Sequence, residues 1–331
     1  MRILHILHGR ELAGMEKICI DLCNELSKEH DVKLIAGEHF KQYIDDSVEY
    51  EPLDLEKSRN NPFFLYHLYT IIKNFSPDIM HAHKQKSILI LKRLEKFVKI
   101  PFIATKQDMK NKKAFHGLRY AVTITEETRT TIKAEHIYKI YNGIPYHEPK
   151  KINMPAGFNI VAIGGLKKVK AYDRLIETVS RLSFPCHLTL VGDGVLREKF
   201  EKRIQELGVE DKVSLVGFQL NVHDYLYSAD LQVISSISEG FSLAMVEGIF
   251  SAKNLISTKV SGCTELLPDE LLYNIEDLTE KINDVYENQE SYHKIFNEVK
   301  KKYKALLTIE QCAKEYVGVY SEIISDYKDN K

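Results

Sequence analysis

The chain contains 331 residues, of which 44% are hydrophobic and 28% charged, and its formal net charge is −1. This length is enough for two domains with their own cores, and the composition excludes a disordered or fibrous protein. The N-terminus is too short and too interrupted for a signal peptide, and no apolar run reaches the roughly 18 residues that a membrane helix needs. We expect a soluble protein or one that lies on a membrane surface.

The first half alternates short apolar strands with amphipathic helices, a rhythm that indicates a parallel sheet. Helices are predicted at 15–26 and 64–75, and strands at 3–7, 32–36, 78–81, 102–104 and 122–124. The rhythm stops near residue 143, and the proline-containing stretch up to residue 155 is predicted to be a linker.

The alternation then starts again. Helices are predicted at 173–182, 196–207 and 243–250, and strands at 160–163, 188–191, 213–216, 231–234 and 255–257. We therefore predict an α/β protein with two Rossmann-like domains, residues 1–150 and 151–307, followed by a helical segment, residues 308–331. Such a pair presents a cleft between the C-terminal ends of two parallel sheets, where these folds bind ligands.

The five cysteines are scattered and lack the spacing of a zinc site: Cys19, Cys23, Cys186, Cys263 and Cys312. Their odd number and apolar surroundings indicate reduced core thiols in a cytosolic protein. Cys19 and Cys23 lie one helical turn apart, a spacing that favours core packing over metal binding.

The most informative stretch runs from Ser235 to Glu247, where a strand leads into a polar turn and a helix. Glu239 lies at the helix mouth and Glu247 one to two turns inside, near the same face. Unpaired amides and the helix dipole favour phosphate at the mouth, and Gly240 lets the backbone approach a ligand. Because a carboxylate there can accept hydrogen bonds from sugar hydroxyls, the turn predicts a nucleotide-sugar site.

The pattern Ser-x-x-Glu-Gly-Phe-x-Leu-x-x-x-Glu resembles that of retaining, family-4-type glycosyltransferases of the GT-B fold. The resemblance implies that Glu247 holds the ribose hydroxyls. It also implies that Glu239 acts at the reaction centre and binds the donor sugar, together with the amides of Gly240, Phe241, Ser242 and Leu243. In this fold the last helix crosses back to the first domain.

Residues 162–173 follow a strand and are similar to the family's basic donor loop. Lys170 matches the family lysine, whose ammonium suits a diphosphate leaving group. The family arginine position holds Gly165, and the family glycine position holds Ala171. Either Lys167 or Lys168 replaces the lost charge, or diphosphate binding is weak.

A second glycine turn, Gly192-Asp193-Gly194, ends a strand and precedes a helix. In the family it lies beside the nucleotide, although a purely structural turn is an equally good interpretation. Phe218 falls in a segment similar to the family's loop next to the base.

In the first domain, the loop around Gly14 resembles the family's glycine loop, with Ala13 in place of its first glycine. The resemblance implies that Gly14 binds the donor by closing the phosphate pocket. His81 and His83 end a strand as a His-x-His pair, and the resemblance gives His83 a catalytic position beside the donor sugar. The pair could in principle bind a metal, but no third ligand is evident. We expect no metal and no cofactor.

The stretch from residue 84 to residue 119 is strongly basic, which favours an anionic partner. Its basic residues are Lys84, Lys86, Lys92, Arg93, Lys96, Lys99, Lys106, Lys110, Lys112, Lys113 and Arg119. Within it, residues 87–99 form an amphipathic helix that either lies on an anionic membrane or acceptor or packs its apolar stripe into the core.

The resemblance implies a metal-independent, retaining hexosyl- or N-acetylhexosaminyltransferase that uses a nucleotide-sugar, with a UDP-sugar favoured. We expect an anionic saccharide or glycolipid acceptor in bacterial lipopolysaccharide core, O-antigen or capsule synthesis, no nucleic-acid partner, and a cytoplasmic location, peripheral on the inner membrane. The alternative is a non-catalytic nucleotide-sugar-binding GT-B scaffold protein.

Overall fold

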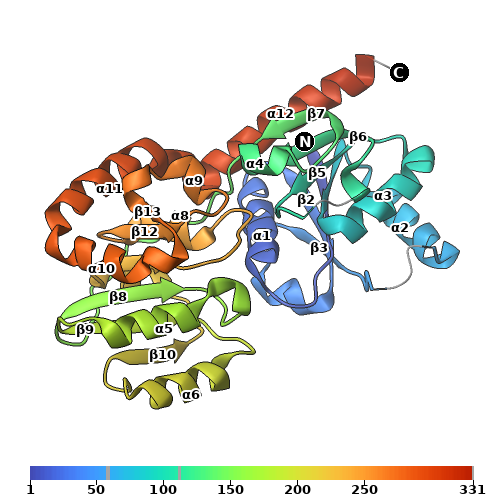
Figure 1. Ribbon diagram of the computed structural model, residues 1–331. Coiled ribbons are helices and arrows are strands. Elements are labelled where there is room, and N and C mark those ends of the chain that lie inside the picture. Colours follow the sequence, from blue (N-terminus) through green and yellow to red (C-terminus); the bar gives the residue numbers. More distant parts are fainter. Residues whose placement is uncertain (57–59, 111–112, 330–331) are drawn as a thin grey trace. The chain divides into compact units, whose positions relative to one another are not determined.

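The computed structural model describes residues 1–56, 60–110 and 113–329 and divides into two compact units (Figure 1). Unit 1 comprises Met1–Pro145 and Leu307–Lys331, and unit 2 comprises Tyr146–Leu306. The chain passes from one unit to the other at residue 145, a little before the predicted boundary at residue 150. Lys112, one of the basic residues named above, lies outside the described residues.

Unit 1 is built on a seven-stranded parallel sheet with the order β3-β2-β1-β4-β5-β6-β7. Its strands are β1 (Arg2–Leu7), β2 (Asp31–Ala36), β3 (Glu49–Pro52), β4 (Ile79–His83), β5 (Phe102–Lys106), β6 (Leu118–Thr123) and β7 (Ala134–Lys139). The edge strands β3 and β7 are the two that the sequence did not predict, because both are short of buried apolar residues.

Two hydrophobic clusters cover the two faces of this sheet. One joins odd-numbered residues of β1 to α1 (Gly14–Leu26) and to the C-terminal helix α12 (Ile309–Asp329). The other joins even-numbered residues of β1 to α2 (Pro62–Phe75) and α3 (Lys84–Val98). The division follows from the two-residue period of a strand, which sends alternate side chains to opposite faces. A short helix, α4 (Glu126–Arg129), precedes β7.

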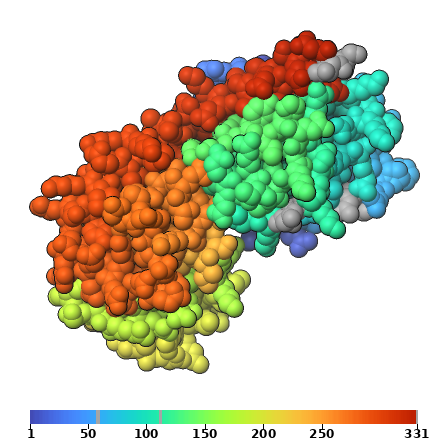
Figure 2. Space-filling model, turned by 45° about the horizontal axis from the view of Figure 1, so that its top comes forward, coloured from blue at the N-terminus to red at the C-terminus, as the bar shows by residue number. Residues whose placement is uncertain are grey.

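Helix α12 returns the end of the chain to unit 1. Ile144 pairs with Thr308 in an isolated parallel bridge, so the chain leaves and re-enters the unit side by side. The helix runs along the surface beside the segment that holds β7 (Figure 2), where Tyr138 Oη donates to Glu322 over 2.7 Å. On its inner side, Tyr320 Oη lies 2.6 Å from Nδ1 of His81.

The position of helix α3 distinguishes between the two interpretations of residues 87–99, membrane or acceptor binding and packing into the core. Its apolar stripe is buried in the core of unit 1, through Ile88, Ile90, Leu91, Leu94 and Val98. This stripe is therefore not available to a membrane, and the core-packed interpretation is the correct one. Arg93, Lys96 and Lys99 remain on the exposed side.

Part of the positive charge predicted in this region is neutralised within unit 1. Lys84 pairs with Glu16, Lys86 with Glu56, Lys106 with Asp108, and Arg119 with Asp326. In the part of the chain that the structure describes, no helix has the length and apolar character needed to cross a membrane.

Unit 2 contains a six-stranded parallel sheet with the order β10-β9-β8-β11-β12-β13. Its strands are β8 (Phe158–Ile163), β9 (Cys186–Val191), β10 (Val213–Gly217), β11 (Leu231–Ile234), β12 (Leu255–Thr258) and β13 (Leu272–Tyr273). Its helices are α5 (Tyr172–Arg181), α6 (Arg197–Leu207), α7 (Val222–Ser228), α8 (Leu243–Ser251), α9 (Cys263–Leu266), α10 (Leu278–Glu287) and α11 (Gln289–Tyr303).

Each sheet has one point where the strand order reverses. In unit 1 this point lies between β1 and β4, and in unit 2 it lies between β8 and β11. Connections leave such a pair of strands toward opposite faces, so a crevice opens outside their carboxyl ends. The predicted site residues gather around these two places.

Candidate functional site

Two loops meet at the reversal point of unit 2. The lysine loop (residues 164–171) follows β8, and the glutamate loop (residues 235–242) follows β11, its neighbour in the sheet. Ser235 Oγ donates to the carbonyl of Lys170 over 2.7 Å, and the amide of Ile237 donates to the carbonyl of Val169 over 2.8 Å. These bonds hold the two loops in one fixed arrangement.

The two residues with the strongest predicted roles are in direct contact. Lys170 Nζ lies 2.6 Å from Oε1 of Glu239, and Ser236 Oγ donates to the same oxygen over 2.7 Å. Both charged side chains are mostly buried, with 18% and 16% exposure. The arrangement places one cation and one carboxylate at the carboxyl end of the sheet.

Backbone conformation explains why small residues occur in the lysine loop. Gly164 has a φ of 143°, and a Cβ there would lie 2.9 Å from Cε of Lys170 and 3.0 Å from the hydroxyl of Tyr172. Ala171 has a left-handed φ of 49°, a conformation that glycine adopts more easily. The chain therefore keeps the turn for which the family uses glycine, but the backbone of Ala171 is strained there.

Tyr172 is a site residue that the sequence interpretation missed. It begins α5, is 2% exposed, and its hydroxyl is buried without a hydrogen-bond partner. Burial raises the pKa of this hydroxyl, and the negative charges of Glu239 and Glu247 raise it further. Tyr172 thus lies within electrostatic reach of both carboxylates. A tyrosine at the start of a helix carried no sequence signal for this role.

Helix α8 begins where the motif predicted a helix mouth. Ser242 is its N-cap, and its side chain accepts from the amide of Met245. Leu243 is the first helical residue, so Glu239 lies in the loop before the helix and Glu247 lies on its second turn, half-buried. Phe241 is buried, and Gly240 is partly exposed. The predicted donor-sugar segment is therefore a capped helix N-terminus next to the Lys170–Glu239 pair.

The structure favours one of the two lysines considered as replacements at Gly165. A Cβ built on Gly165 would lie 3.5 Å from Cε and 3.7 Å from Cδ of Lys167. The stem of Lys167 thus lies next to the position where a larger residue 165 would begin. Both lysines are exposed, and Lys168 begins a 3-10 turn.

The glycine turn after β9 packs against the lysine loop. A Cβ on Gly192 would lie 2.2 Å from the carbonyl oxygen of Gly164, and one on Gly194 would lie 2.8 Å from the amide nitrogen of Leu166. Both glycines are therefore needed for this close approach. Phe218, in contrast, is 68% exposed and makes no contact that assigns it to the site.

The corresponding place in unit 1 holds Gly14, His83 and a buried ion pair. Gly14 is exposed at the start of α1. Glu16 is 1% exposed and pairs with Lys84, a non-glycine residue with a φ of 66°. The pair links α1 to the start of α3, and neither member was predicted as a site residue.

A pocket of about 610 Å³ opens beside these residues, at the carboxyl ends of β1, β2 and β3. Glu56 is at the centre of its polar lining, with His8 at 2.8 Å, Arg10 at 3.1 Å and Lys86 at 3.5 Å. The hydrogen bond from Arg10 lowers the pKa of Glu56 to about 2, aided by His8 and Lys86. The pocket was not predicted, because its lining comes from three separate loops.

His83 lies in the core of unit 1. It is 3% exposed, its Nε2 lies 3.0 Å from Nδ1 of His5, and its Nδ1 has no hydrogen-bond partner. Burial, with a smaller contribution from the charge of His5, holds the pKa of His83 well below its usual range, so the ring is neutral at physiological pH. His81 has the same burial and the same direction of pKa shift.

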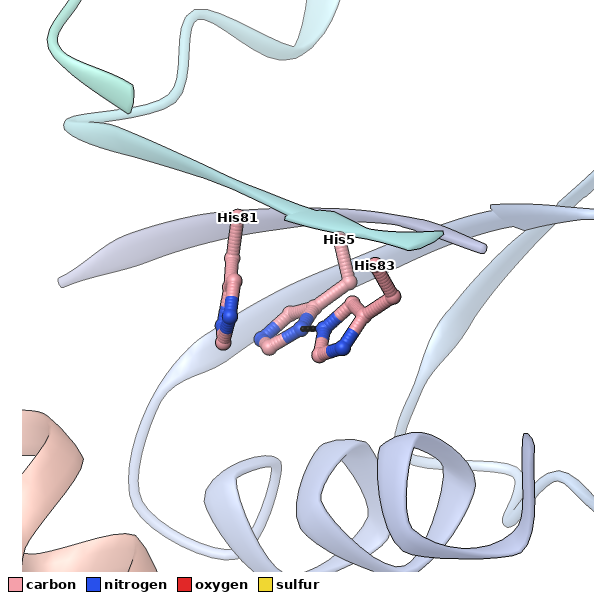
Figure 3. A group of neighbouring side chains, drawn as sticks. All are labelled: His5, His81 and His83. Atoms are coloured by element: carbon pink, nitrogen blue, oxygen red, sulfur yellow. Dashed lines mark hydrogen bonds between the residues drawn. The ribbon is translucent and has the colours of Figure 1, made fainter. Parts of the chain in front are cut away.

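A third histidine, His5, lies beside His81 and His83 and was not identified from the sequence. It pairs with His81 across the β1–β4 ladder, and the three imidazoles project from the same face of the sheet (Figure 3). His5 also faces Cys19 and Cys23 on α1. Burial alone would raise the pKa of the Cys23 thiol, but a hydrogen bond with Cys19 and the neighbouring charge of His5 lower it to about 6.

Family models match the two units in turn. Residues 12–147 match glycosyltransferase family 4, and residues 148–302 match glycosyl transferases group 1. The chain is 24% identical over 276 residues to the lipopolysaccharide core biosynthesis glycosyltransferase LpsD of Rhizobium meliloti (strain 1021), covering 79% of this chain and 79% of that relative.

A second relative is the N-acetylgalactosamine-N,N'-diacetylbacillosaminyl-diphospho-undecaprenol 4-alpha-N-acetylgalactosaminyltransferase of Campylobacter jejuni subsp. jejuni serotype O:2. It is 33% identical over 112 residues, which cover 34% of this chain and 31% of the relative. Among solved structures, HepE of Anabaena in complex with UDP superposes with a TM-score of 0.82 at 18% identity, covering 97% of this chain and 100% of that one.

The two family matches together run from residue 12 to residue 302 without a gap. The strand orders, the reversal points and the structural likeness agree with them. The chain belongs to the group 1 glycosyltransferases of the family-4 type and has their two-domain, Rossmann-like GT-B fold.

Proposed function

We propose that this glycosyltransferase moves a hexosyl or N-acetylhexosaminyl group from a UDP-sugar to a saccharide acceptor in the synthesis of a bacterial envelope glycan. The observation that carries the proposal is the convergence of Lys170, Glu239 and the N-terminus of α8 at the reversal point of unit 2. A cation and a helix N-terminus suit a diphosphate, and a carboxylate suits sugar hydroxyls.

The relatives support the choice of donor and pathway. HepE was solved with UDP and with UDP-glucose, and LpsD is named for lipopolysaccharide core biosynthesis. In our proposal Lys170 and Lys167 bind the diphosphate, Glu247 binds the ribose, and Glu239 binds the donor sugar. Lipopolysaccharide core, O-antigen or capsule is the proposed product.

We propose that the reaction retains configuration and uses no metal ion. The bond from the anomeric carbon to the diphosphate oxygen breaks while the acceptor oxygen bonds to the same face of that carbon. The acceptor proton passes to the departing phosphate oxygen, and lysines and backbone amides stabilise the diphosphate charge. His83 acts in this scheme as a neutral neighbour of the sugar, in keeping with its lowered pKa.

For the acceptor we propose the pocket of unit 1. Its lining by Glu56, Arg10 and His8 offers both hydrogen-bond donors and acceptors to sugar hydroxyls.

We also propose a cytoplasmic location with peripheral contact to anionic lipid. This contact would depend on basic side chains alone, because the apolar stripe of α3 is buried. Neutral replacement of Arg93, Lys96 and Lys99 should weaken binding to anionic vesicles at low salt. Unchanged partitioning would reject the membrane contact.

The central test is thermal unfolding of the protein with UDP, GDP and ADP in turn. A nucleotide at about 100 times its dissociation constant stabilises the folded state by about 2.7 kcal/mol. We expect a shift with UDP that is lost in Glu247→Ala. Sugar transfer that disappears in Glu239→Ala would then separate an enzyme from a non-catalytic binder, and the anomeric configuration of the product, read by NMR, tests retention.

A further inference from the structure

A cluster of metal-ligating side chains lies under α1 in unit 1. It includes none of the groups used in the proposed transfer, although His5 is bonded to His83. His5, Cys19 and Cys23 each offer one ligand atom, and these atoms all lie within 4.8 Å of one another. All three residues are fully buried, with 0% exposure. Two thiol sulfurs and an imidazole nitrogen are the donors that zinc takes in proteins.

The local fold brings these three residues together. His5 is an odd-numbered residue of β1, and its neighbours on that face, Ile3 and Leu7, pack in the cluster that contains α1. Cys19 and Cys23 are four residues apart on α1, so both lie on the helix face that meets this strand. One strand and one helix therefore supply all three donors.

The imidazole of His5 uses one nitrogen in a hydrogen bond and has the other nitrogen available for a metal ion. Its Nδ1 lies 3.0 Å from Nε2 of His83, while its Nε2 is buried without a hydrogen-bond partner. Buried polar atoms in native proteins are nearly always satisfied. Metal-bound histidines commonly use their second nitrogen for such an outer hydrogen bond, which also sets the tautomer.

The second group of neighbouring ligands, His5, His81 and His83, is less suited to a metal. His81 uses both of its nitrogens in hydrogen bonds, Nδ1 with Tyr320 at 2.6 Å and Nε2 with Thr105 at 2.7 Å. A metal ion there would have to break one of these bonds. Figure 3 shows the three rings side by side, with the dashed bond joining only His5 and His83.

We propose that Cys19 Sγ, Cys23 Sγ and His5 Nε2 bind one Zn²⁺ ion per chain. Binding releases the thiol protons to solvent, and two thiolates balance the charge of a divalent cation, so the buried site remains neutral. The remaining position of a tetrahedral zinc falls to a non-protein donor such as water. The ion would join β1 to α1 inside unit 1 and take no part in sugar transfer.

The first test uses the whole protein, purified under reducing conditions and stripped with a chelator. Titration with Co²⁺, a coloured substitute for Zn²⁺, should give a thiolate-to-cobalt charge-transfer band that saturates at one ion per chain. Excess Zn²⁺ should bleach the band. Absence of the band in the reduced protein would overturn the proposal.

Matched variants assign the ligands. Cys19→Ser and Cys23→Ser should lose the band, and His5→Gln should shift or lose it, whereas Cys186→Ser, at a buried thiol of unit 2, should keep it. His81→Asn should also keep the band, and its loss in that variant would point to the three-histidine group instead. A band that survives in Cys23→Ser would reject the site.

A measurement on the unmodified protein covers the case in which a variant fails to fold. Zn²⁺ should raise the unfolding temperature of the chelator-stripped wild-type chain, and a second addition of chelator should reverse this increase. An unfolding temperature that Zn²⁺ does not change would overturn the proposal.

Discussion

Lys170 Nζ lies 2.6 Å from Oε1 of Glu239, although 69 positions separate the two residues in the chain. The pair balances its own charge before a ligand arrives. A negatively charged donor must therefore share or displace Glu239 in order to reach the ammonium of Lys170. Removing the charge of Lys170 should therefore weaken nucleotide binding, whereas removing the charge of Glu239 should preserve or strengthen it.

We predict that Lys170→Met lowers the affinity for UDP by about tenfold or more, because a hydrogen bond to a charged group contributes about 1.5–3 kcal/mol. Glu239→Gln removes the competing carboxylate, so UDP affinity should be kept or increased while sugar transfer is lost. Calorimetric titration of both variants, with transfer measured in parallel, checks this. Weaker UDP binding in Glu239→Gln would contradict the proposed competition.

A second prediction separates the two lysines near Gly165. Because the stem of Lys167 lies beside Gly165, the position of the family arginine, Lys167→Ala should reduce UDP affinity by about tenfold, as expected for one charged hydrogen bond. Lys168→Ala should change it little. Equal losses in both variants would show that the loop acts only through its total charge.

The conformation of Gly164 gives a prediction about stability. Gly164→Ala should destabilise unit 2 by about 1–3 kcal/mol, because its φ of 143° disfavours a side chain and the new methyl would contact Lys170 and Tyr172. The control is Gly318→Ala on the exposed side of α12, where nothing lies within 4 Å of the added Cβ. This change should stabilise the protein by about 0.5–1 kcal/mol. Denaturant unfolding measures both.

The bond between Tyr320 and His81 can be tested by removing one hydroxyl. Tyr320→Phe should cost about 1–3 kcal/mol, because Nδ1 of a buried histidine loses its partner. Tyr66→Phe, at a side chain that is 69% exposed, should have almost no effect. If both substitutions were equally mild, the bond would not contribute to holding α12 on unit 1.

Lys300 gives a prediction about pH. Burial lowers its pKa to about 8, with a smaller contribution from Lys304. The folded state therefore carries a penalty for the charged lysine below pH 8, and this penalty disappears as pH rises to the unfolded pKa of about 10.4. The stability of the wild type relative to Lys300→Met should increase between pH 8 and pH 10. A difference that is constant across this range would show that Lys300 is not perturbed.

Strong apolar periodicity predicted most of the elements around the two sites, and the resemblance supplied the residue roles. Edge strands such as Glu49–Pro52 and Ala134–Lys139 were missed because they depend on a neighbouring strand more than on their own apolar content. The position of His5 beside His83 was missed for a different reason. It depends on the pairing of β1 with β4, which are 78 positions apart at that contact and which no local pattern specifies.

The contacts that define the donor site could not be predicted from local sequence patterns either. The pattern around Glu239 indicated a helix mouth, but the bond to Lys170 required β8 and β11 to be neighbours. Tyr172 and the stem of Lys167 gained their positions from the close packing of three loops. Long-range strand order thus decides which predicted residues act together.

The bridge between Ile144 and Thr308 has a consequence for how the protein is made. Unit 2 is in effect an insertion into a surface turn of unit 1, whose two ends already touch. During synthesis, which proceeds from the N-terminus, residues 146–306 are complete while unit 1 still lacks α12. The sheet face around His81 and Thr105 therefore stays uncovered until α12 has been synthesised. Binding partners that protect a half-built apolar face would act on unit 1 and not on unit 2.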